Sequence, residues 1–183
     1  MTQVIHVRGN VFVAADRNTP ATPIRGSVLL DPDEYVRTDD RSLAELRLPD
    51  GSVVEIGQNT EIQAGEFHRT EFRGAAGQNV ISIFRGTIRF HIVRTDNTPA
   101  NYKFQTPQLQ IAIRGTTATV SVTDTLTEVT MLEGSAGISA GNGSTFILRA
   151  GQTFRVRSDG GQILSKEIIP TAVDPSPTPA GRP

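Results

Sequence analysis

The residue types that most often perform chemistry in proteins are sparse and scattered in this chain. Its 183 residues include three histidines, His6, His68 and His91, and no cysteine. Without cysteine the chain has no disulfide, no thiolate metal site and no cysteine nucleophile. The histidines lie far apart in the sequence, and no pair of them has the spacing of a metal site. We interpret them as surface or rim histidines rather than catalytic or metal-binding groups.

Carboxylates gather in two short stretches, Asp31-Pro32-Asp33-Glu34 and Asp39-Asp40. A calcium site needs several oxygens that converge, and the spacing here matches no calcium loop. Aspartate is also an ordinary turn residue, so we favour turns over calcium. Asp50 and Glu55 flank another turn, but they do not form the carboxylate pair that polysaccharide hydrolysis requires. We therefore predict no metal and no cofactor.

Serine nucleophiles and phosphate-binding loops also lack their usual settings. The stretch Gly134-Ser135-Ala136-Gly137 is one position short of a Gly-x-Ser-x-Gly motif. The glycine-containing stretches 114–117 and 141–144 do not precede a helix with a lysine, as a phosphate loop would. The sequence thus predicts a protein that is not an enzyme and that binds no small molecule.

A row of hydroxyl side chains is the one surface pattern that stands out. Thr117, Thr119, Ser121 and Thr123 alternate along one segment, so a strand there places all four on one face. Such a flat face is a possible interaction surface for ice, sugar or another protein. The alternative is that threonine is simply a favoured exposed strand residue. A sugar site is poorly supplied, because the chain has no tryptophan and two tyrosines.

Charge and hydropathy exclude further classes of function. Lysine plus arginine number 18 and aspartate plus glutamate 19, so the net charge is -1. Nucleic-acid binding needs clustered basic residues, whereas these are scattered. No segment approaches the roughly 20 apolar residues of a membrane-spanning helix. The first residues do not resemble a secretory signal, so the protein either stays where it is made or has lost a leader.

Alternating apolar residues predict an all-β protein. Ala44, Leu46 and Leu48 alternate with polar positions, and a second apolar run follows at 53–56. Between them, Pro49-Asp50-Gly51-Ser52 has the composition of a tight turn in which glycine takes a positive φ. The pattern predicts a hairpin. Further strands are predicted at 4–7, 11–14, 79–84, 86–93, 102–106, 117–122, 128–132, 136–139, 145–148 and 153–156.

The remaining segments carry turn and linker signals. Residues 66–76 combine glycines with no helical apolar spacing, which predicts a loop. Asp159-Gly160-Gly161 predicts a turn, and Pro170 to Pro183 predicts an extended, proline-rich tail. We expect one β-roll or β-sandwich-like domain of many short strands over residues 1–157. Residues 158–183 then hold a turn, a final strand and the tail or linker.

Several landmarks follow one another in a characteristic order. They are Ser42-Leu43-Ala44-Glu45-Leu46-Arg47-Leu48-Pro49-Asp50-Gly51-Ser52, Phe84-Arg85-Gly86-Thr87-Ile88-Arg89-Phe90, Phe104-Gln105-Thr106-Pro107, Ile113-Arg114-Gly115-Thr116-Thr117-Ala118-Thr119-Val120, Val129-Thr130-Met131-Leu132-Glu133-Gly134 and Leu148-Arg149-Ala150-Gly151-Gln152. This order resembles the FecR domain of bacterial envelope proteins over roughly residues 4–157. The resemblance implies an all-β, roll-like domain. In signalling members this domain lies in the periplasm and relays the state of an outer-membrane siderophore transporter to a sigma-factor partner.

The sequence departs from the signalling members because no membrane helix and no cytoplasmic helical segment precede the domain. We therefore do not expect sigma regulation. The first hypothesis is a non-catalytic interaction or assembly module of the bacterial cell envelope, periplasmic or extracellular if a leader was removed. It would act through strand edges and loops on a protein partner or by self-association. The alternative is a structural subunit of a filament, surface layer or virion, and the third is a polysaccharide enzyme.

Overall fold

The computed structural model describes residues 2–65, 79–93, 102–113 and 115–166. These residues form 17 strands, and none of them lies in a helix, so the predicted all-β class is confirmed. No helix in these segments is long and apolar enough to cross a membrane. The strands are β1 (Gln3–Arg8), β2 (Val11–Ala14), β3 (Thr22–Ile24), β4 (Ser27–Leu29), β5 (Tyr35–Thr38), β6 (Leu43–Arg47), β7 (Val53–Ile56), β8 (Glu61–Ala64), β9 (Asn79–Ile92), β10 (Tyr102–Gln105), β11 (Leu109–Ile113), β12 (Thr116–Val122), β13 (Leu126–Glu133), β14 (Ser135–Ala140), β15 (Thr145–Arg149), β16 (Gln152–Arg157) and β17 (Gln162–Lys166).

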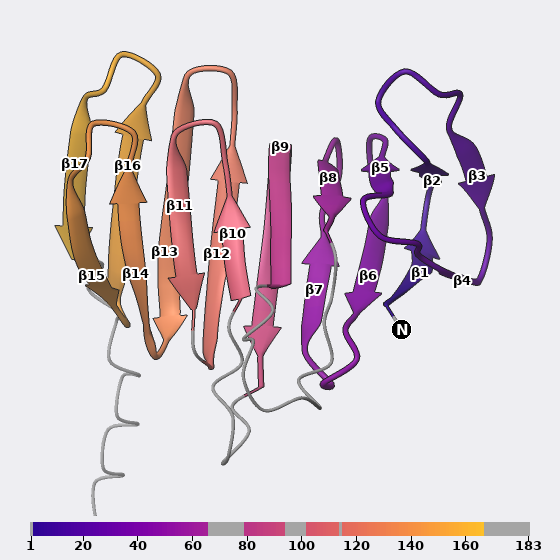
Figure 1. Cartoon of the computed structure of the whole chain (residues 1–183), viewed down its shortest axis with the longest axis horizontal. Helices are drawn as coiled ribbons and strands as arrows, with labels where there is room; N and C mark the ends of the chain where they lie inside the picture. Colours follow the sequence, from indigo (N-terminus) through magenta and orange to yellow (C-terminus); the bar gives the residue numbers. More distant parts are fainter. Residues whose placement is uncertain (1, 66–78, 94–101, 114, 167–183) are drawn as a thin grey trace, which may run out of the picture.

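The strands form two stacked layers that share β9 (Figure 1). Layer A has the order β4-β1-β6-β7-β9-β12-β13-β16-β17, and all of its pairs are antiparallel. Layer B has the order β3-β2-β5-β8-β9-β10-β11-β14-β15. Its single parallel pair is β9 with β10. Adjacent strands lie about 4.8 Å apart, so each layer is about 40 Å wide.

The two ends of this sandwich are made by four edge strands. The strands β3 and β4 lie at one end, and β15 and β17 lie at the other (Figure 1). We call these the N-terminal end and the C-terminal end. Because the chain passes repeatedly from one layer to the other, both edges at an end come from neighbouring parts of the sequence.

The predicted hairpin is confirmed in β6 and β7, whose register places Leu46 opposite Val54. Gly51 in the connecting turn has a φ of 88°, as its position in the turn required. Asp50 in the same turn accepts a hydrogen bond of 2.8 Å from the hydroxyl of Tyr102. Burial of the Tyr102 ring, followed by this bond to a carboxylate, raises the pKa of Tyr102 well above its usual value. Asp50 therefore has a structural role that attaches the turn to β10.

Residues 79–84 and 86–93 are not two strands, as predicted, but the single 14-residue strand β9. Its first half pairs with β8 and β10 in layer B, and its second half pairs with β7 and β12 in layer A. Buried residues fall at odd positions before Gly86 and at even positions after it, so the inward face changes there. Gly86 has a φ of 93°, which allows the strand to bend from one layer into the other.

Five strands, β3, β4, β5, β8 and β11, were not predicted. The first four have three or four residues each, and β4 is exposed throughout, so none carries a long alternating pattern. In β11 the alternation is clear, but it follows Pro107, which we took only as the end of β10. Other predicted strands agree to within a few residues. The predicted loop at 66–76 and the tail at 170–183 lie outside the described residues.

The interior between the layers is one continuous apolar cluster. At its centre the rings of Phe90, from β9 in layer A, and Phe104, from β10 in layer B, stack with centroids 4.2 Å apart. Both side chains are fully buried. The stack therefore joins the two layers close to the point where β9 crosses between them.

Candidate functional site

The structure places the predicted hydroxyl row on the outer face of layer A, along β12. Ala118, Val120 and Val122 point to the core, as predicted. The strand is central, with β9 on one side and β13 on the other. Thr117 is buried, Thr119 and Ser121 are half-buried, and Thr123 is exposed just beyond the strand.

Neighbouring strands already occupy several of these hydroxyls. The Ser121 hydroxyl lies 3.1 Å from that of Thr87 on β9. Thr123 accepts from the backbone N–H of Leu126, which closes the turn into β13. The row ends there, because the chain reverses and Thr127 is fully buried on β13. Its hydroxyls thus contribute to cross-strand bonding as well as to the surface.

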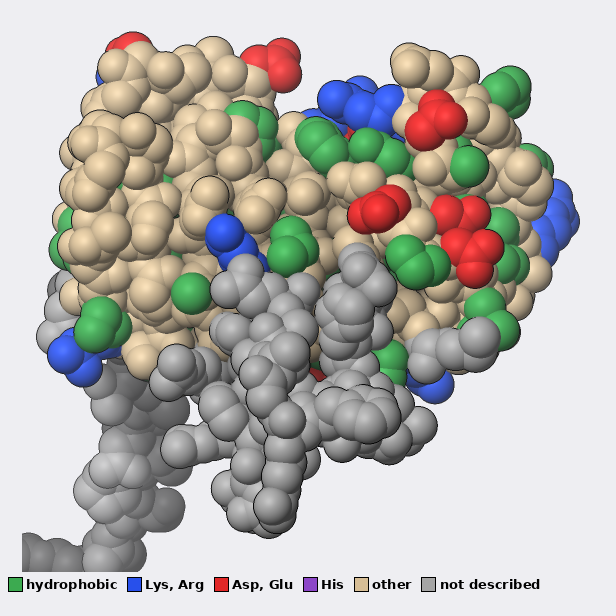
Figure 2. Space-filling view, in the orientation of Figure 1, with side chains coloured by type: hydrophobic (Ala, Val, Ile, Leu, Met, Phe, Trp, Pro, Cys, Tyr) green, Lys and Arg blue, Asp and Glu red, His purple; other side chains and the backbone are tan. Residues whose placement is uncertain are grey.

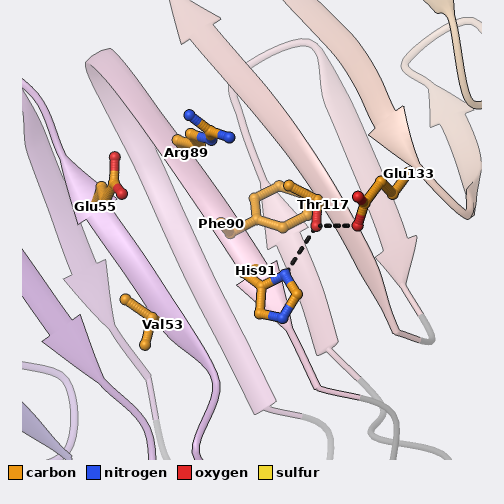
Figure 3. A pocket seen from close by; sticks show the side chains of 7 residues that line it. All are labelled: Val53, Glu55, Arg89, Phe90, His91, Thr117 and Glu133. Carbon is orange, nitrogen blue, oxygen red and sulfur yellow. Dashed lines mark hydrogen bonds between the residues drawn. The ribbon is translucent and has the colours of Figure 1, made fainter.

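His91 on β9 lies beside the end of this row (Figure 3). Its Nδ1 is 2.8 Å from the Thr117 hydroxyl, which in turn donates to Glu133 Oε2 over 3.1 Å. These side chains come from β9, β12 and β13. Together with Val53, Glu55, Arg89 and Phe90 they line a hollow of about 340 Å³ that is open to solvent.

The order of the groups in this chain decides its chemistry. In an activated hydroxyl nucleophile, the imidazole lies between the hydroxyl and the carboxylate and takes the hydroxyl proton. Here the hydroxyl of Thr117 lies in the middle and gives its only proton to Glu133. His91 Nδ1 must then donate to Thr117, which leaves Nε2 as an acceptor in the neutral ring. The arrangement orients His91 but does not activate Thr117.

The other histidines do not join this group. His6 contacts the backbone carbonyl of Gly9 at 2.8 Å through Nε2. His68 lies outside the described residues. Among the described residues no three His, Cys, Asp or Glu side chains converge as metal ligands. Within the first acidic stretch, Glu34 accepts from the backbone N–H of Asp31, which is a local turn contact.

A second polar cluster, which was not predicted from the sequence, lies on the outer face of layer B. Glu61 on β8 is 5% exposed and is contacted by three arginines. Its oxygens lie 2.7 Å from Arg17 Nε, 3.8 Å from Arg37 Nε and 3.6 Å from Arg85 Nε. Register explains the gathering, because Arg37 and Arg85 stand directly opposite Glu61 on the two adjacent strands.

The arginine cluster compensates a costly burial. An isolated buried carboxylate is strongly unfavourable, so cations beside Glu61 offset the loss of its hydration. Arg17 also stacks over the ring of Phe84, with its guanidinium 4.5 Å from the ring centroid. These side chains line a second hollow, separate from the one beside His91, and Asp124 lines it as well. The hollow therefore brings together two carboxylates and three guanidinium groups. We interpret the cluster as a structural ion-pair network.

The N-terminal end of the sandwich has the features of a protected edge. Its strands β3 and β4 have three residues each. Pro23 in β3 has no N–H to offer to another strand. Short edge strands and proline are the usual means by which proteins prevent pairing at a sheet edge.

The C-terminal end has none of these protections. Its edge strands β15 and β17 have five residues each, no proline, and one cation apiece in Arg149 and Lys166. Large apolar side chains are exposed along both strands, with Ile147 60%, Ile163 54% and Leu164 56% exposed. Within the described residues no strand pairs with the outer side of β15 or β17.

The hydrogen-bond pattern shows which backbone groups point outward at this end. Antiparallel pairs alternate between bonded and non-bonded residues. Because Ala140 N–H donates to the Ser144 carbonyl, β15 turns the backbone groups of Thr145 and Ile147 away from its neighbour. Because Arg157 N–H donates to the Gly161 carbonyl, Leu164 on β17 is oriented in the same way. The end therefore offers paired donors and acceptors beside apolar side chains.

These features define an all-β sandwich with polar outer faces, one end of which no described strand covers, and in which His6, His91 and Glu61 each have a polar partner within the protein. The FecR protein family model matches residues 34–137, more than half of the chain. The chain belongs to the FecR family, as its sequence landmarks indicated. A comparison with curated proteins gave no match.

Two solved structures share the fold. Crystal structures of a putative anti-sigma factor from Parabacteroides distasonis ATCC 8503, at 2.50 and 1.65 Å resolution, each align with a TM-score of 0.59 and 20% sequence identity. Each alignment covers 73% of this chain and 59% of that one. The likeness shows the fold, and this chain spans about three fifths of the protein that it matches.

Proposed function

We propose that this protein is a non-catalytic protein-binding module of the bacterial cell envelope, and that it binds through the C-terminal end of its sandwich. A strand of another chain would add to β15 or β17 by backbone hydrogen bonds, which is a common mode of protein recognition. The observation that carries the proposal is the contrast between the edge strands at the two ends. At the N-terminal end these strands have three residues each and one contains proline. At the C-terminal end they have five residues each, expose large apolar side chains, and have no described strand on their outer side.

The family supports this reading. The anti-sigma factor that shares the fold is named for a regulatory protein interaction, and we extend that class of role to this chain. The same family resemblance supports an envelope location. The outer faces supply further contacts by which a partner is selected, since an added strand alone gives affinity with little sequence preference.

The hydroxyl row of Thr117, Thr119, Ser121 and Thr123 is the second contact surface that we propose. It supports protein contact better than sugar binding, because the described residues that line the adjoining hollow include no tryptophan or tyrosine and the ring of Phe90 is fully buried. The space-filling view shows mixed charges and scattered apolar groups over the visible face, without one dominant sign of charge (Figure 2).

Site-specific photocrosslinking in the native bacterium tests the proposal. A photoreactive residue placed at Ile147 or Leu164 is expected to give a covalent adduct with a protein. The matched controls carry the same residue at Leu29, on the protected end, and at Val7, which is 49% exposed on β1. Both controls are expected to give little adduct.

The site of crosslinking and the mass of the adduct separate the outcomes. Adducts at Ile147 and Leu164 but not at Leu29 support binding through the C-terminal end. A further variant carries the photoreactive residue at Thr119, and adducts confined to that variant would move the binding surface to the hydroxyl row. Equal adducts at Leu29 and Leu164 whose masses form a ladder of many copies of this chain would instead support a structural subunit of a filament or surface layer. That is the other function compatible with exposed edges.

A further inference from the structure

We propose that the strand added at the C-terminal end is contributed by a second copy of this chain, so that two copies form a symmetric dimer with continuous layers. This inference rests on the proposed function and names its partner. It is supported by the self-complementary register of both edge strands, by an end of the core that no described strand covers, and by the protection of the opposite end.

The register of β17 allows this strand to pair with the β17 of a second copy. An antiparallel self-pair centred on Leu164 brings together two residues whose backbone N–H and C=O already point outward. Leu164 then lies opposite Leu164 of the second copy, and Lys166 lies opposite Gln162. Gln162, Ile163, Leu164 and Ser165 carry no charge, so no like charges meet among these residues in this arrangement.

The register of β15 repeats this property in the other layer. Ile147 has outward backbone groups and is the middle residue of the strand. A self-pair centred on it places Ile147 opposite itself and Arg149 opposite Thr145. Ile147 is exposed because its cross-strand neighbour is Gly137, which has no side chain to cover it. A second Ile147 would supply that cover.

One two-fold axis can serve both layers. Leu164 lies directly across from Phe154, and the ring of Phe154 contacts that of Phe146 on β15, with centroids 4.5 Å apart. The centres of the two edge strands therefore adjoin the same ring contact, since Leu164 pairs with Phe154 and Ile147 follows Phe146. An axis perpendicular to the layers at this point pairs β17 with β17 and β15 with β15 together.

The same arrangement completes the core. Leu164 shares the inward face with Phe154, yet it is 56% exposed, because no described apolar side chain lies beyond it at this end. In the dimer it would pack against its own copy and against Phe146. Symmetric self-pairing closes the assembly at two copies, since the protected N-terminal ends remain outside.

Charge-swap variants test the dimer by size-exclusion chromatography with light scattering. The wild type is expected to have twice the mass of one chain at high concentration. Leu164→Lys and Leu164→Glu each place like charges opposite one another, so each is expected to be monomeric, with a dissociation constant raised about a hundredfold or more. The rescue is tested at Ile147, because this residue lies on the outer face and is 60% exposed. Ile147→Lys and Ile147→Glu are each expected to be monomeric, and mixing these two variants pairs Lys with Glu at the surface and is expected to restore the dimer mass.

Several results overturn the inference. A wild type that stays monomeric at every concentration refutes it, as does a dimer that neither Leu164 variant disrupts. A mixture of the two Ile147 variants that remains monomeric refutes the self-pair at residue 147. Long assemblies that Leu29→Lys abolishes would show head-to-tail contact. If the wild type is monomeric but Leu164 still crosslinks to a different protein, the second copy is excluded while the proposed function stands.

Discussion

Replacing Gly86 with alanine is expected to lower the free energy of unfolding by about 3 kcal/mol or more. A Cβ at this position would lie 2.2 Å from Thr60 Oγ1 and 2.4 Å from Thr60 Cα. The second contact is with backbone, which cannot rotate away. The Thr60 hydroxyl also accepts from Thr87 N–H, so displacing Thr60 breaks the bond that holds β9 at its bend.

The matched control is Gly51→Ala. Gly51 has nearly the same φ, 88° against 93°, but no atom lies within 4 Å of its Cβ position. The free energy of unfolding of Gly51→Ala should fall by only about 1 kcal/mol, which is the cost of placing alanine in a left-handed conformation. Chemical denaturation of both variants measures the difference. Equal losses would show that Gly86 is required only for its backbone angle and that the close approach of Thr60 is wrong.

Replacing Phe104 with alanine is expected to lower the free energy of unfolding by about 3–5 kcal/mol. Phe104 is fully buried and stacks on Phe90 in the other layer. Truncation removes the ring and leaves a cavity between the layers at the place where β9 crosses. Phe12→Ala is the control, because Phe12 on β2 is half-buried and points away from the core. That variant should lose about 1 kcal/mol.

Denaturant titration again gives the measurement. The ratio of the two losses is more informative than either value, since both variants remove the same ring. Similar losses for Phe104→Ala and Phe12→Ala would contradict a core that lies between the two layers. A larger loss at Phe12 would mean that the inward and outward faces of layer B have been exchanged.

The fold class could be predicted because alternation is local and strong. In β6, β7 and β12 every second residue is buried, and the turn at Gly51 carries its own signal. The path of β9 could not be predicted, because its bend depends on Thr60, which is 26 residues away in the sequence. Strands of three residues were also missed, since their positions are set by pairing with distant strands rather than by their own residues.

The candidate surfaces also combine features that follow from local sequence with features that depend on distant strands. The hydroxyl row could be placed on one face from spacing alone, but its contact with His91 and Glu133 depends on which strands lie beside β12. The arginines around Glu61 are scattered in the sequence and meet only through strand register. The open end could be anticipated only in general terms, because no local pattern says which strand of a sheet is the last.

Hydrogen exchange at four backbone amides tests the central claim most directly, that another chain adds at the C-terminal end. In the dilute, unbound protein Phe146 and Ile163 bond to their neighbouring strands and should exchange slowly, whereas Ile147 and Leu164 face outward and should exchange fast. On self-association, or in complex with any protein that crosslinks there, the amides of Ile147 and Leu164 should become protected. Fast exchange at both amides in every bound state would contradict the account.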